Sequence, residues 1–494
     1  MLWSDLEVDL GTSPASDFQV VYVTYDSRLA AQGVVFVAIP GTHQDGHRFV
    51  AQALGSGAPV AVVERLADDC PRERQLLVAD SRVALAELAA ALNRDPSRDL
   101  PVIGVTGTDG KTTTTTMLQA ALTASLGCAG SLTTIDFRLG KEVEPNLLRQ
   151  TTLEAPEIQR HLREMADRGC RAAVVESTSH GLALHRLDRI QFAGAVFTNI
   201  THEHLDFHGT WENYFQAKAT LLDKACSSGG FAVLNFDDPL AYHRLRQRSH
   251  GPTLTYSAQG SAGADLRAGT AIPQDGGISF TASTPAGSAP VRLRMAGRWN
   301  VGNALAALAA GLLLDQPLPT LVQGLEELTF IPGRMEAVDL GQPFSVIVDY
   351  AHTPAALSLA LYELRASTPG RLIVVFGSAG ERDRAKRPEM GRIAAQLADH
   401  VVVTTEDPRG EDEEAIIEEI CRGAIDAGAV EGENLERISD RSEAIARAIA
   451  VALPGDTVLL AGKGHERSII RAAGPVPWDE RQAAEQALRV RLKQ

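Results

Sequence analysis

Hydrophobic residues along the chain occur in short runs rich in valine and isoleucine, separated by stretches in which they recur every three or four positions. This alternation is typical of α/β folds, in which strands and helices follow one another. In the first hundred residues the expected strands are Phe18–Tyr25, Val34–Ile39 and Val60–Val63, and the expected helices are Phe49–Leu54 and Val83–Leu92. The polar segment Asn93–Pro101, which contains two prolines, predicts a linker.

A second α/β region begins at Pro101. Its first strand, Val102–Val105, leads into a turn rich in glycine and threonine and then into a helix that extends through Ala124. A helix at Pro156–Arg168 and strands at Ala172–Val175 and Gly194–Phe197 are expected next. Residues 257–290 are rich in Gly, Ala, Ser and Pro, which predicts hairpins.

A third region from about residue 333 repeats the α/β pattern. Its expected strands are Phe344–Val348, Leu372–Phe376, Val401–Thr404 and Thr457–Leu460. Asp349, Gly377, Glu406 and Gly462 lie just beyond these strands. Ligands of open parallel sheets bind beyond the carboxyl ends of the strands, so a site is expected there.

Composition narrows the possible partners. The formal net charge of −15 argues against a nucleic-acid or anionic-membrane surface. The five cysteines are separate in the sequence and form no CxxC pair, which argues against a zinc ribbon or a disulfide framework and fits a reducing cytoplasm. The N-terminus lacks the apolar core of a signal peptide, and the apolar window Ala304–Leu314 is too short to span a membrane. We therefore expect a cytoplasmic protein in which that window is a buried helix.

The segment from Val105 to Thr113, VTGTDGKTT, lies between an expected strand and an expected helix. Glycines let such a loop fold around phosphate oxygens, and a helix N-terminus presents free N–H groups. Lys111 would contact the outer phosphates and Thr112 would reach Mg²⁺. The strict GxxxxGK[ST] spacing is not met, because position 105 is Val. A glycine–threonine turn with an unrelated lysine is the alternative, but the strand–loop–helix context favours ATP binding.

The shorter loop GTDGKTT resembles that of the Mur ligase family, which includes folylpolyglutamate synthetase. Further blocks along the chain resemble the same family in the same order. They are Thr198–Gly209, Gly297–Asn303 (GRWNVGN), Pro332–Glu336 (PGRME), Val348–Pro354 (VDYAHTP), Phe376–Gly377 with Arg382–Pro388, Asp407–Arg409 (DPR) and Gly462–Glu466 (GKGHE). The last three are similar to the MurE branch of the family.

The resemblance implies three domains. They are a smaller N-terminal α/β domain at residues 1–98 that binds the UDP end of the substrate, a central P-loop ATPase domain with a mostly parallel sheet at 99–332, and a C-terminal Rossmann-like domain at 333–494 that binds the amino acid. It also implies an ATP-dependent ligase of peptidoglycan precursor synthesis, which adds a diamino acid to UDP-MurNAc-L-Ala-D-Glu. The carboxylate would be activated as an acyl phosphate, so positioning and charge neutralisation matter most.

Catalytic and metal-binding roles follow from the matched blocks. Lys111, Glu176, His204 and Lys218 are the implied catalytic residues, and Mg²⁺ would be held by Thr112, Glu176, His204 and a carbamate formed on Lys218. A carbamate supplies the oxygen ligand that an ammonium cannot. Zinc binding by the HEHLD segment is disfavoured, because it is not HExxH. Without the resemblance, Glu176 would be a surface acid, His204 a structural histidine and Lys218 an exposed helical lysine.

The same blocks imply the binding residues. ATP would be bound by Gly107, Thr108, Asp109, Gly110, Lys111, Thr112, Thr113, Asn300, Asn303, Arg334 and Asp349, with Asn235 and Asp237 on the adenine and ribose side. Uridine diphosphate would be bound by Ser27, Arg28, Thr42 and His43, and the muramoyl-dipeptide by Thr151, Thr152, Thr178 and Arg186. The chain departs from the common pattern at Gln150, Thr178 and Leu184. For most of these residues ordinary turn chemistry is the alternative.

Asp407, Arg409, Gly462 and Glu466 would bind the incoming amino acid. The tetrapeptide ending at Arg409 is EDPR, where enzymes that add meso-diaminopimelate usually carry DNPR. Arg409 can pair with a distal carboxylate. The extra charge of Asp407 favours a distal ammonium, hence L-lysine or L-ornithine, while Arg409, Gly462 and Glu466 keep meso-diaminopimelate open.

Two other readings stay open: a folylpolyglutamate synthetase-like ligase and a non-catalytic P-loop binding module. We expect the partners to be small molecules only, with no nucleic acid and no membrane insertion, and we expect a monomer. Because ATP contacts and amino-acid contacts must meet, the chemistry also predicts domain closure.

Overall fold

The computed structural model describes residues 1–41, 44–148, 150–201, 203–274 and 277–493. The chain forms two compact units. The first contains Met1–Ala268, Ala282–Ala289 and Gly302–Leu325, and the second contains Gly269–Thr281, Pro290–Val301 and Glu326–Gln494. No helix among the described residues is long and apolar enough to cross a bilayer.

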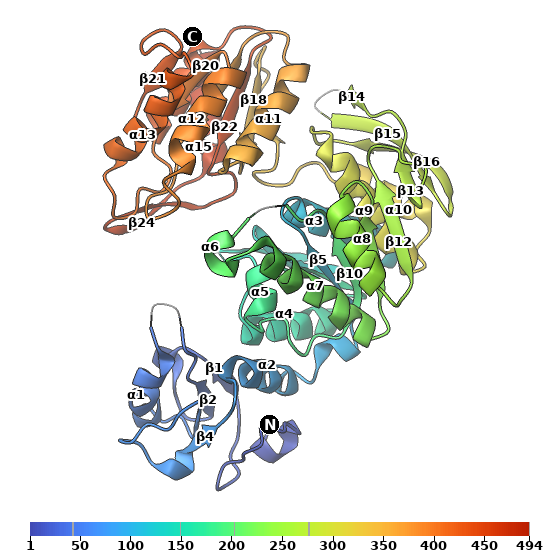
Figure 1. The fold of residues 1–494 in the computed structure, drawn as a ribbon, viewed down its shortest axis with the longest axis vertical. Helices are drawn as coiled ribbons and strands as arrows, with labels where there is room; N and C mark the ends of the chain where they lie inside the picture. The colour runs from blue at the N-terminus through green and yellow to red at the C-terminus, as the bar shows by residue number, and fades with distance from the viewer. Residues whose placement is uncertain (42–43, 149, 202, 275–276, 494) are drawn as a thin grey trace. The chain divides into compact units, whose positions relative to one another are not determined.

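The N-terminal part of the first unit is a four-stranded parallel sheet in the order β1-β2-β3-β4 (Figure 1). Its strands are β1 Tyr22–Thr24, β2 Val34–Val37, β3 Ala61–Val63 and β4 Gln75–Leu77, and its helices are α1 Val50–Gly55 and α2 Ser81–Leu92. Side chains alternate between two cores: Val35 and Val37 belong to the core that includes α2, and Phe36 to the one that includes α1. Burial on both faces explains the continuous apolar runs.

The expected first strand is shorter than the pattern suggested. Trp3 N donates to Phe18 O at 2.9 Å and Val20 N donates to Met1 O at 2.7 Å. Residues 18–20 therefore pair with the chain's first residues, and β1 begins at Tyr22.

The central sheet has 12 strands in the order β14-β15-β13-β12-β11-β10-β5-β9-β6-β7-β8, with β16 paired to β15. Strands β12 to β6 along this order are parallel, and the hairpin β7–β8 is antiparallel to its neighbours. The strands are β5 Val102–Thr106, β6 Gly130–Leu132, β7 Asp136–Leu139, β8 Glu142–Pro145, β9 Ala173–Glu176, β10 Phe192–Phe197, β11 Phe231–Asn235, β12 Thr253–Ser257, β13 Leu266–Ala268, β14 Ile272–Gln274, β15 Gly277–Thr284 and β16 Gly287–Leu293.

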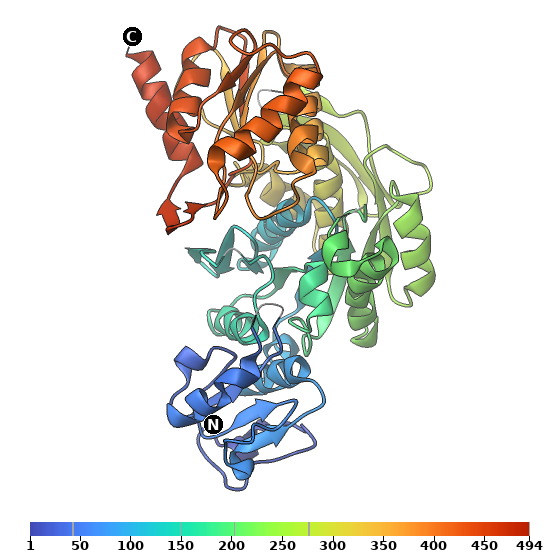
Figure 2. The ribbon, with the colours of Figure 1, turned by 60° about the vertical axis from the view of Figure 1, so that its left-hand side comes forward.

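Helices cover both faces of the central sheet's parallel part (Figures 1 and 2). They are α3 Lys111–Leu126, α4 Ala155–Asp167, α5 Ser179–Ala183, α6 Leu205–His208, α7 Trp211–Ser227, α8 Pro239–Arg248, α9 Trp299–Leu313 and α10 Leu318–Glu327. Apolar residues of α4 and α7 share one core with the side chains of β5, β9 and β10 that face them. Residues 304–310 of α9 are almost fully buried, as the apolar window predicted.

The C-terminal part has a six-stranded sheet in the order β17-β18-β22-β19-β20-β21, parallel except for β17. Helices α11, α12 and α13 pack on one face and α14 and α15 on the other. The strands are β17 Glu336–Ala337, β18 Ser345–Asp349, β19 Leu372–Phe376, β20 His400–Val403, β21 Leu435–Arg437 and β22 Thr457–Ala461, followed by the hairpin β23 Ser468–Arg471 and β24 Gly474–Pro477. The helices are α11 Pro354–Ser367, α12 Lys386–Leu397, α13 Glu413–Asp426, α14 Arg441–Val451 and α15 Glu480–Leu492.

A buried ion pair fixes the carboxyl end of this sheet. The Arg441 guanidinium bonds the Glu480 carboxylate at 2.6 Å and also donates to the carbonyls of Thr405 at 3.1 Å and Ala461 at 2.9 Å. Both charged side chains are at most 1% exposed. The α/β class and the mostly parallel sheets are as expected, while the domain boundaries at residues 98 and 332 stay predictions.

Candidate active site

The phosphate loop joins β5 to α3 and is held tightly from two sides. A Cβ at Gly107 would lie 1.7 Å from Thr198 Oγ1, just after β10. Gly110 has a φ of +80°, and a Cβ there would lie 2.5 Å from Asn303 Oδ1 on α9. Gly107 has a φ of +155°, so both positions require glycine for space and for backbone conformation.

Two lysines converge on this loop. Lys111 Nζ donates to Gly107 O at 3.1 Å and to Thr108 O at 2.7 Å. Lys218 Nζ, from α7, donates to Gly107 O at 2.6 Å. Lys218 is 1% exposed, and burial, followed by the charge of Lys111, lowers the pKa of its amine well below the ordinary value. A lowered pKa favours the neutral amine, which is the nucleophilic form of a lysine.

Glu176, at the end of β9, lies against the first turn of α3. Its carboxylate accepts hydrogen bonds from Thr112 Oγ1 at 2.9 and 3.0 Å. Thr134, which the sequence did not single out, also donates to this carboxylate, from its N–H at 3.0 Å and its hydroxyl at 3.1 Å. The structure thus brings the expected pair Thr112 and Glu176 together in an oxygen-rich setting.

His204 lies in the loop after β10, with φ of +55° and a side chain that is 44% exposed. Its ring is 4.8 Å from that of His180 and 6.4 Å from that of Tyr214. Tyr214, in turn, shares a hydrogen bond of 3.0 Å with Thr108 Oγ1. His204 therefore neighbours the loop through Tyr214, which sequence reasoning missed.

Threonines cluster beside Glu176. Thr152 Oγ1 donates to Glu176 O at 2.8 Å and accepts from Thr178 N at 3.0 Å. Arg186 donates to Thr152 O at 3.1 Å and pairs with Glu154 at 2.7 Å. Thr151 Oγ1 accepts from Thr134 Oγ1 at 3.0 Å, so all four residues expected to hold the muramoyl-dipeptide lie close to Glu176.

In the N-terminal part of the chain, Asp26, Ser27 and Arg28 lie in a turn with a surface ion pair. Turn chemistry of this kind is the alternative that the sequence left open for the expected uridine-binding residues. Arg28 bonds the Asp26 carboxylate at 2.5 Å and is 84% exposed, and Ser27 Oγ lies 3.5 Å from Gln52 Oε1. A role for Ser27 and Arg28 in uridine binding stays a prediction. Thr42 and His43 lie outside the described residues.

The asparagines divide by position. Asn303 Oδ1 accepts from Thr114 Oγ1 at 3.1 Å, next to Gly110, so Asn303 reaches the phosphate loop. Asn300 Nδ2 donates to Ala296 O at 2.6 Å, at the start of α9. Asn235 donates to Thr198 O at 2.6 Å. Asp237, expected on the ribose side, accepts from Ser257 Oγ at 2.6 Å and Ala258 N at 2.8 Å, so it joins the ends of β11 and β12, and its contact with ribose stays a prediction.

In the second unit, Asp349 ends β18 and accepts from Met335 N at 2.8 Å and Ala351 N at 2.9 Å. Burial raises the pKa of this carboxyl, and the Arg334 guanidinium opposes the rise. Arg334 lies 4.9 Å from the centre of the Tyr350 ring. Arg334 and Asp349, both expected to bind ATP, are therefore neighbours.

Asp407 is already paired. Its Oδ1 accepts from Lys463 Nζ at 2.8 Å and from Ile470 N at 2.9 Å, and Lys463 also bonds Glu466 Oε2 at 2.5 Å. Lys463 is fully buried. The ammonium of Lys463 is thus shared between Asp407 and Glu466 and offsets part of their charge, and the preference for L-lysine or L-ornithine stays a prediction.

Arg409 and Gly462 lie at the same end of the sheet. Arg409 has a φ of +55°, and its N–H donates to Ile470 O at 2.9 Å. A Cβ at Gly462 would lie 3.4 Å from Glu406 Oε2. Burial raises the pKa of Glu406, while Lys386, Lys463 and Arg441 oppose the rise. The sequence missed these three cations, because burial of charged residues follows only from the assembled sheet.

Family models match three successive stretches of the chain. They are described as "Mur ligase family, catalytic domain" at residues 19–92, "Mur ligase middle domain" at 105–311 and "Mur ligase, glutamate ligase domain" at 333–464. The chain belongs to the Mur ligase family. The expected three-domain architecture and the expected class, an ATP-dependent ligase, are confirmed.

Relatives of this Mur ligase match along nearly its whole length. A protein of Roseiflexus sp. (strain RS-1) named UDP-N-acetylmuramyl-tripeptide synthetase is 46% identical and covers 96% of both chains. A UDP-N-acetylmuramoyl-L-alanyl-D-glutamate–2,6-diaminopimelate ligase of Thermosynechococcus vestitus is 41% identical, over 97% of this chain and 95% of the relative. A solved structure of a ligase with that same name is 31% identical, with a TM-score of 0.67, and covers 96% of this chain and 95% of its own.

Proposed function

We propose that this Mur ligase uses ATP to join a diamino acid to UDP-MurNAc-L-Ala-D-Glu in peptidoglycan precursor synthesis. The observation that carries the proposal is the whole-length likeness to a UDP-N-acetylmuramyl-tripeptide synthetase. The proposal is supported by the four side chains that gather at one phosphate loop, which are Lys111, Thr112, Glu176 and Lys218. We also expect the enzyme to be a cytoplasmic monomer.

The reaction begins with activation of a carboxylate, since a carboxylate does not react with an amine at neutral pH. Phosphoryl transfer from ATP gives an acyl phosphate, and attack by the amine then leaves an amide, ADP and phosphate. The ammonium of Lys111, poised over the loop, is placed to stabilise the negative charge of the transferring phosphoryl group.

Thr112, Glu176, His204 and the carbamate of Lys218 would hold Mg²⁺. The Thr112 hydroxyl and the Glu176 carboxylate meet at 2.9 Å, and such oxygen donors suit a hard cation. Bound Mg²⁺ neutralises charge on the phosphates. Thr152, Thr178 and Arg186, packed beside Glu176, would place the dipeptide's carboxylate near this site.

The carbamate on Lys218 rests on the place of that amine, which is buried and lies 2.6 Å from Gly107 O of the phosphate loop. A buried neutral amine can attack CO₂ to give a carbamate. The carbamate offers Mg²⁺ an anionic oxygen in place of the amine, which is a poor ligand for this ion. Lys218→Ala should lower kcat at least about 100-fold, and acetate should restore part of it by supplying a carboxylate in the vacated space. Lys224→Ala is the matched control, because Lys224 is on the same helix and pairs with Asp188 in a partly exposed position. Full activity of Lys218→Ala would exclude the carbamate.

The identity of the amino acid is a separate question. Arg409 favours an acceptor with a distal carboxylate, while Asp407, which shares Lys463 with Glu466, favours a distal ammonium, so both types of diamino acid are tested. The test offers L-lysine, L-ornithine or meso-diaminopimelate with ATP and UDP-MurNAc-L-Ala-D-Glu and measures phosphate release. Release with one of these amino acids supports the proposal. Release only with a folate and glutamate would indicate the alternative ligase, and release with none would indicate a binding module.

A further inference from the structure

Two cysteines lie side by side at the end of α3 that is far from the phosphate loop. Cys128 follows the helix and Cys170 precedes β9, and their sulfur atoms are 3.1 Å apart although 42 positions separate them. The backbone holds them there, because Arg171 N donates to Cys128 O at 3.0 Å. Cys170 is buried and Cys128 is partly exposed.

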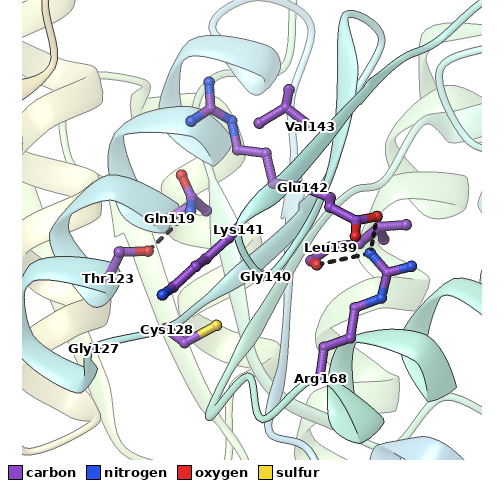
Figure 3. A pocket seen from close by; sticks show the side chains of 11 residues that line it. Gln119, Thr123, Gly127, Cys128, Leu139, Gly140, Lys141, Glu142, Val143 and Arg168 are labelled. Atoms are coloured by element: carbon purple, nitrogen blue, oxygen red, sulfur yellow. Dashed lines mark hydrogen bonds and ion pairs between the residues drawn. The ribbon is translucent and has the colours of Figure 1, made fainter.

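Cys128 lines a pocket of about 660 Å³ between α3, the β7–β8 hairpin and the end of α4 (Figure 3). The turn of the hairpin lies over the thiols, since a Cβ at Gly140 would be 3.8 Å from each sulfur. None of the residues assigned to ATP, dipeptide or amino-acid binding lines this pocket. It is therefore distinct from the candidate active site.

The pocket is rich in cations. Arg138, Lys141 and Arg168 line it, against one lining carboxylate, Glu142, which is paired with Arg168 at 2.5 Å. In Figure 3 the Lys141 side chain extends from the hairpin toward α3 and Cys128. Arg138 pairs with Asp136 at 3.4 Å through Nη2, while its Nε is buried without a hydrogen-bond partner within the described part of the chain, and Lys141 adds a further cation. These groups favour an anionic ligand.

We propose that this pocket admits an anionic low-molecular-weight disulfide, which exchanges with Cys128 and Cys170 to form a protein disulfide. The thiolate of Cys128 attacks one sulfur of the ligand, whose S–S bond breaks and releases one thiolate. Cys170 then passes its proton to a departing thiolate and attacks Cys128 Sγ, displacing the second half of the ligand. Two protein thiols are oxidised, and the ligand is reduced to two thiols.

The order of attack follows from access. Cys128 faces the pocket, whereas burial, together with the adjacent thiol, raises the pKa of Cys170 to about 12 and keeps it protonated until the mixed disulfide forms beside it. A metal does not explain the pair, because the described residues contain no group of three or more His, Cys, Asp or Glu side chains placed to hold one. The product would link α3 to β9, whose opposite ends carry Thr112 and Glu176.

The test treats reduced full-length protein with glutathione disulfide, which is anionic, then with cystamine, which is cationic, and maps thiols by alkylation and peptide mass spectrometry. With glutathione disulfide we expect a Cys128–Cys170 disulfide to form. Its rate of formation should be at least about tenfold higher than the rate at which glutathione disulfide reacts with Cys70 or Cys226, the other partly exposed thiols. Cys170→Ala should stop at a glutathione mixed disulfide on Cys128.

The charge of the pocket is tested separately. Lys141→Gln should slow reaction with glutathione disulfide several-fold and leave or raise the rate with cystamine, while Lys493→Gln, an exposed lysine on the C-terminal side, should change neither. Equal rates at Cys128 and Cys70 would overturn the proposal. So would a Cys170→Ala product identical to the wild-type product, or a Lys141→Gln variant with an unchanged preference between the two disulfides.

Discussion

Gly107→Ala is expected to disable the phosphate loop without unfolding the domain. The added Cβ would lie 1.7 Å from Thr198 Oγ1, so that hydroxyl must move by more than about 1 Å to reach ordinary contact. It now donates to Asp109 O at 2.6 Å and Thr106 O at 3.3 Å. Losing both bonds costs the loop about 1–3 kcal/mol, and a displacement of about 1 Å at a catalytic loop lowers the rate about 100-fold.

The assay is phosphate release at saturating ATP, dipeptide substrate and amino acid, with circular dichroism to confirm folding. Thr198→Ala removes the same hydrogen bonds without a clash and should cost about tenfold or less. The double variant Gly107→Ala/Thr198→Ala should fall between the two single variants, since Thr198 Cβ, at 3.0 Å, stays close to the new methyl group. Activity of Gly107→Ala within about threefold of wild type would refute the steric reasoning.

Three further outcomes are expected. Lys111→Ala should abolish ATP-dependent turnover but keep the fold, and retained ligase activity in that variant would contradict the mechanism. Arg441→Met should destabilise the C-terminal domain by about 3–5 kcal/mol in urea unfolding, because it leaves Glu480 buried and unpaired, and adding Glu480→Leu should recover most of the loss. The Arg387 guanidinium lowers the pKa of Glu411 from 4.5 to about 2, so the stability that this carboxylate contributes is fully present above pH 4.5 and is lost as the pH falls toward 2. Glu411→Gln should therefore reduce the slope of the free energy of unfolding against pH in that window. An unchanged slope would count against the Arg387–Glu411 pair.

Strands could be predicted well where burial on both faces leaves a continuous apolar run. Leu372–Phe376 was expected and is β19. The expected strand from Phe18 begins instead at Tyr22, because residues 18–20 pair with the first residues of the chain. The local pattern indicates extended backbone there but cannot indicate its partner.

The contacts of the candidate site could likewise be predicted only in part. Thr112 and Glu176 could be expected to meet, because Thr112 follows the loop at the end of one strand and Glu176 lies at the end of another. The structure brings them into contact. Thr134 was missed because its role depends on β6 lying beside β9. Lys463 was missed as the partner of Asp407 because a lysine is usually exposed. Here Lys463 is buried just after β22, which only the folded chain shows.

The place of β5 in the central sheet has a consequence for synthesis on the ribosome. β5 lies between β9 and β10, whose pairing residues come about 70 and 90 positions later in the chain. At about 5–20 residues per second, both edges of β5 wait roughly five to twenty seconds for their partners. The apolar strand that leads into the phosphate loop is therefore exposed to wrong associations on both edges during that time, so substitutions that slow docking of β9 or β10 should lower the soluble yield while the protein that does fold keeps its specific activity.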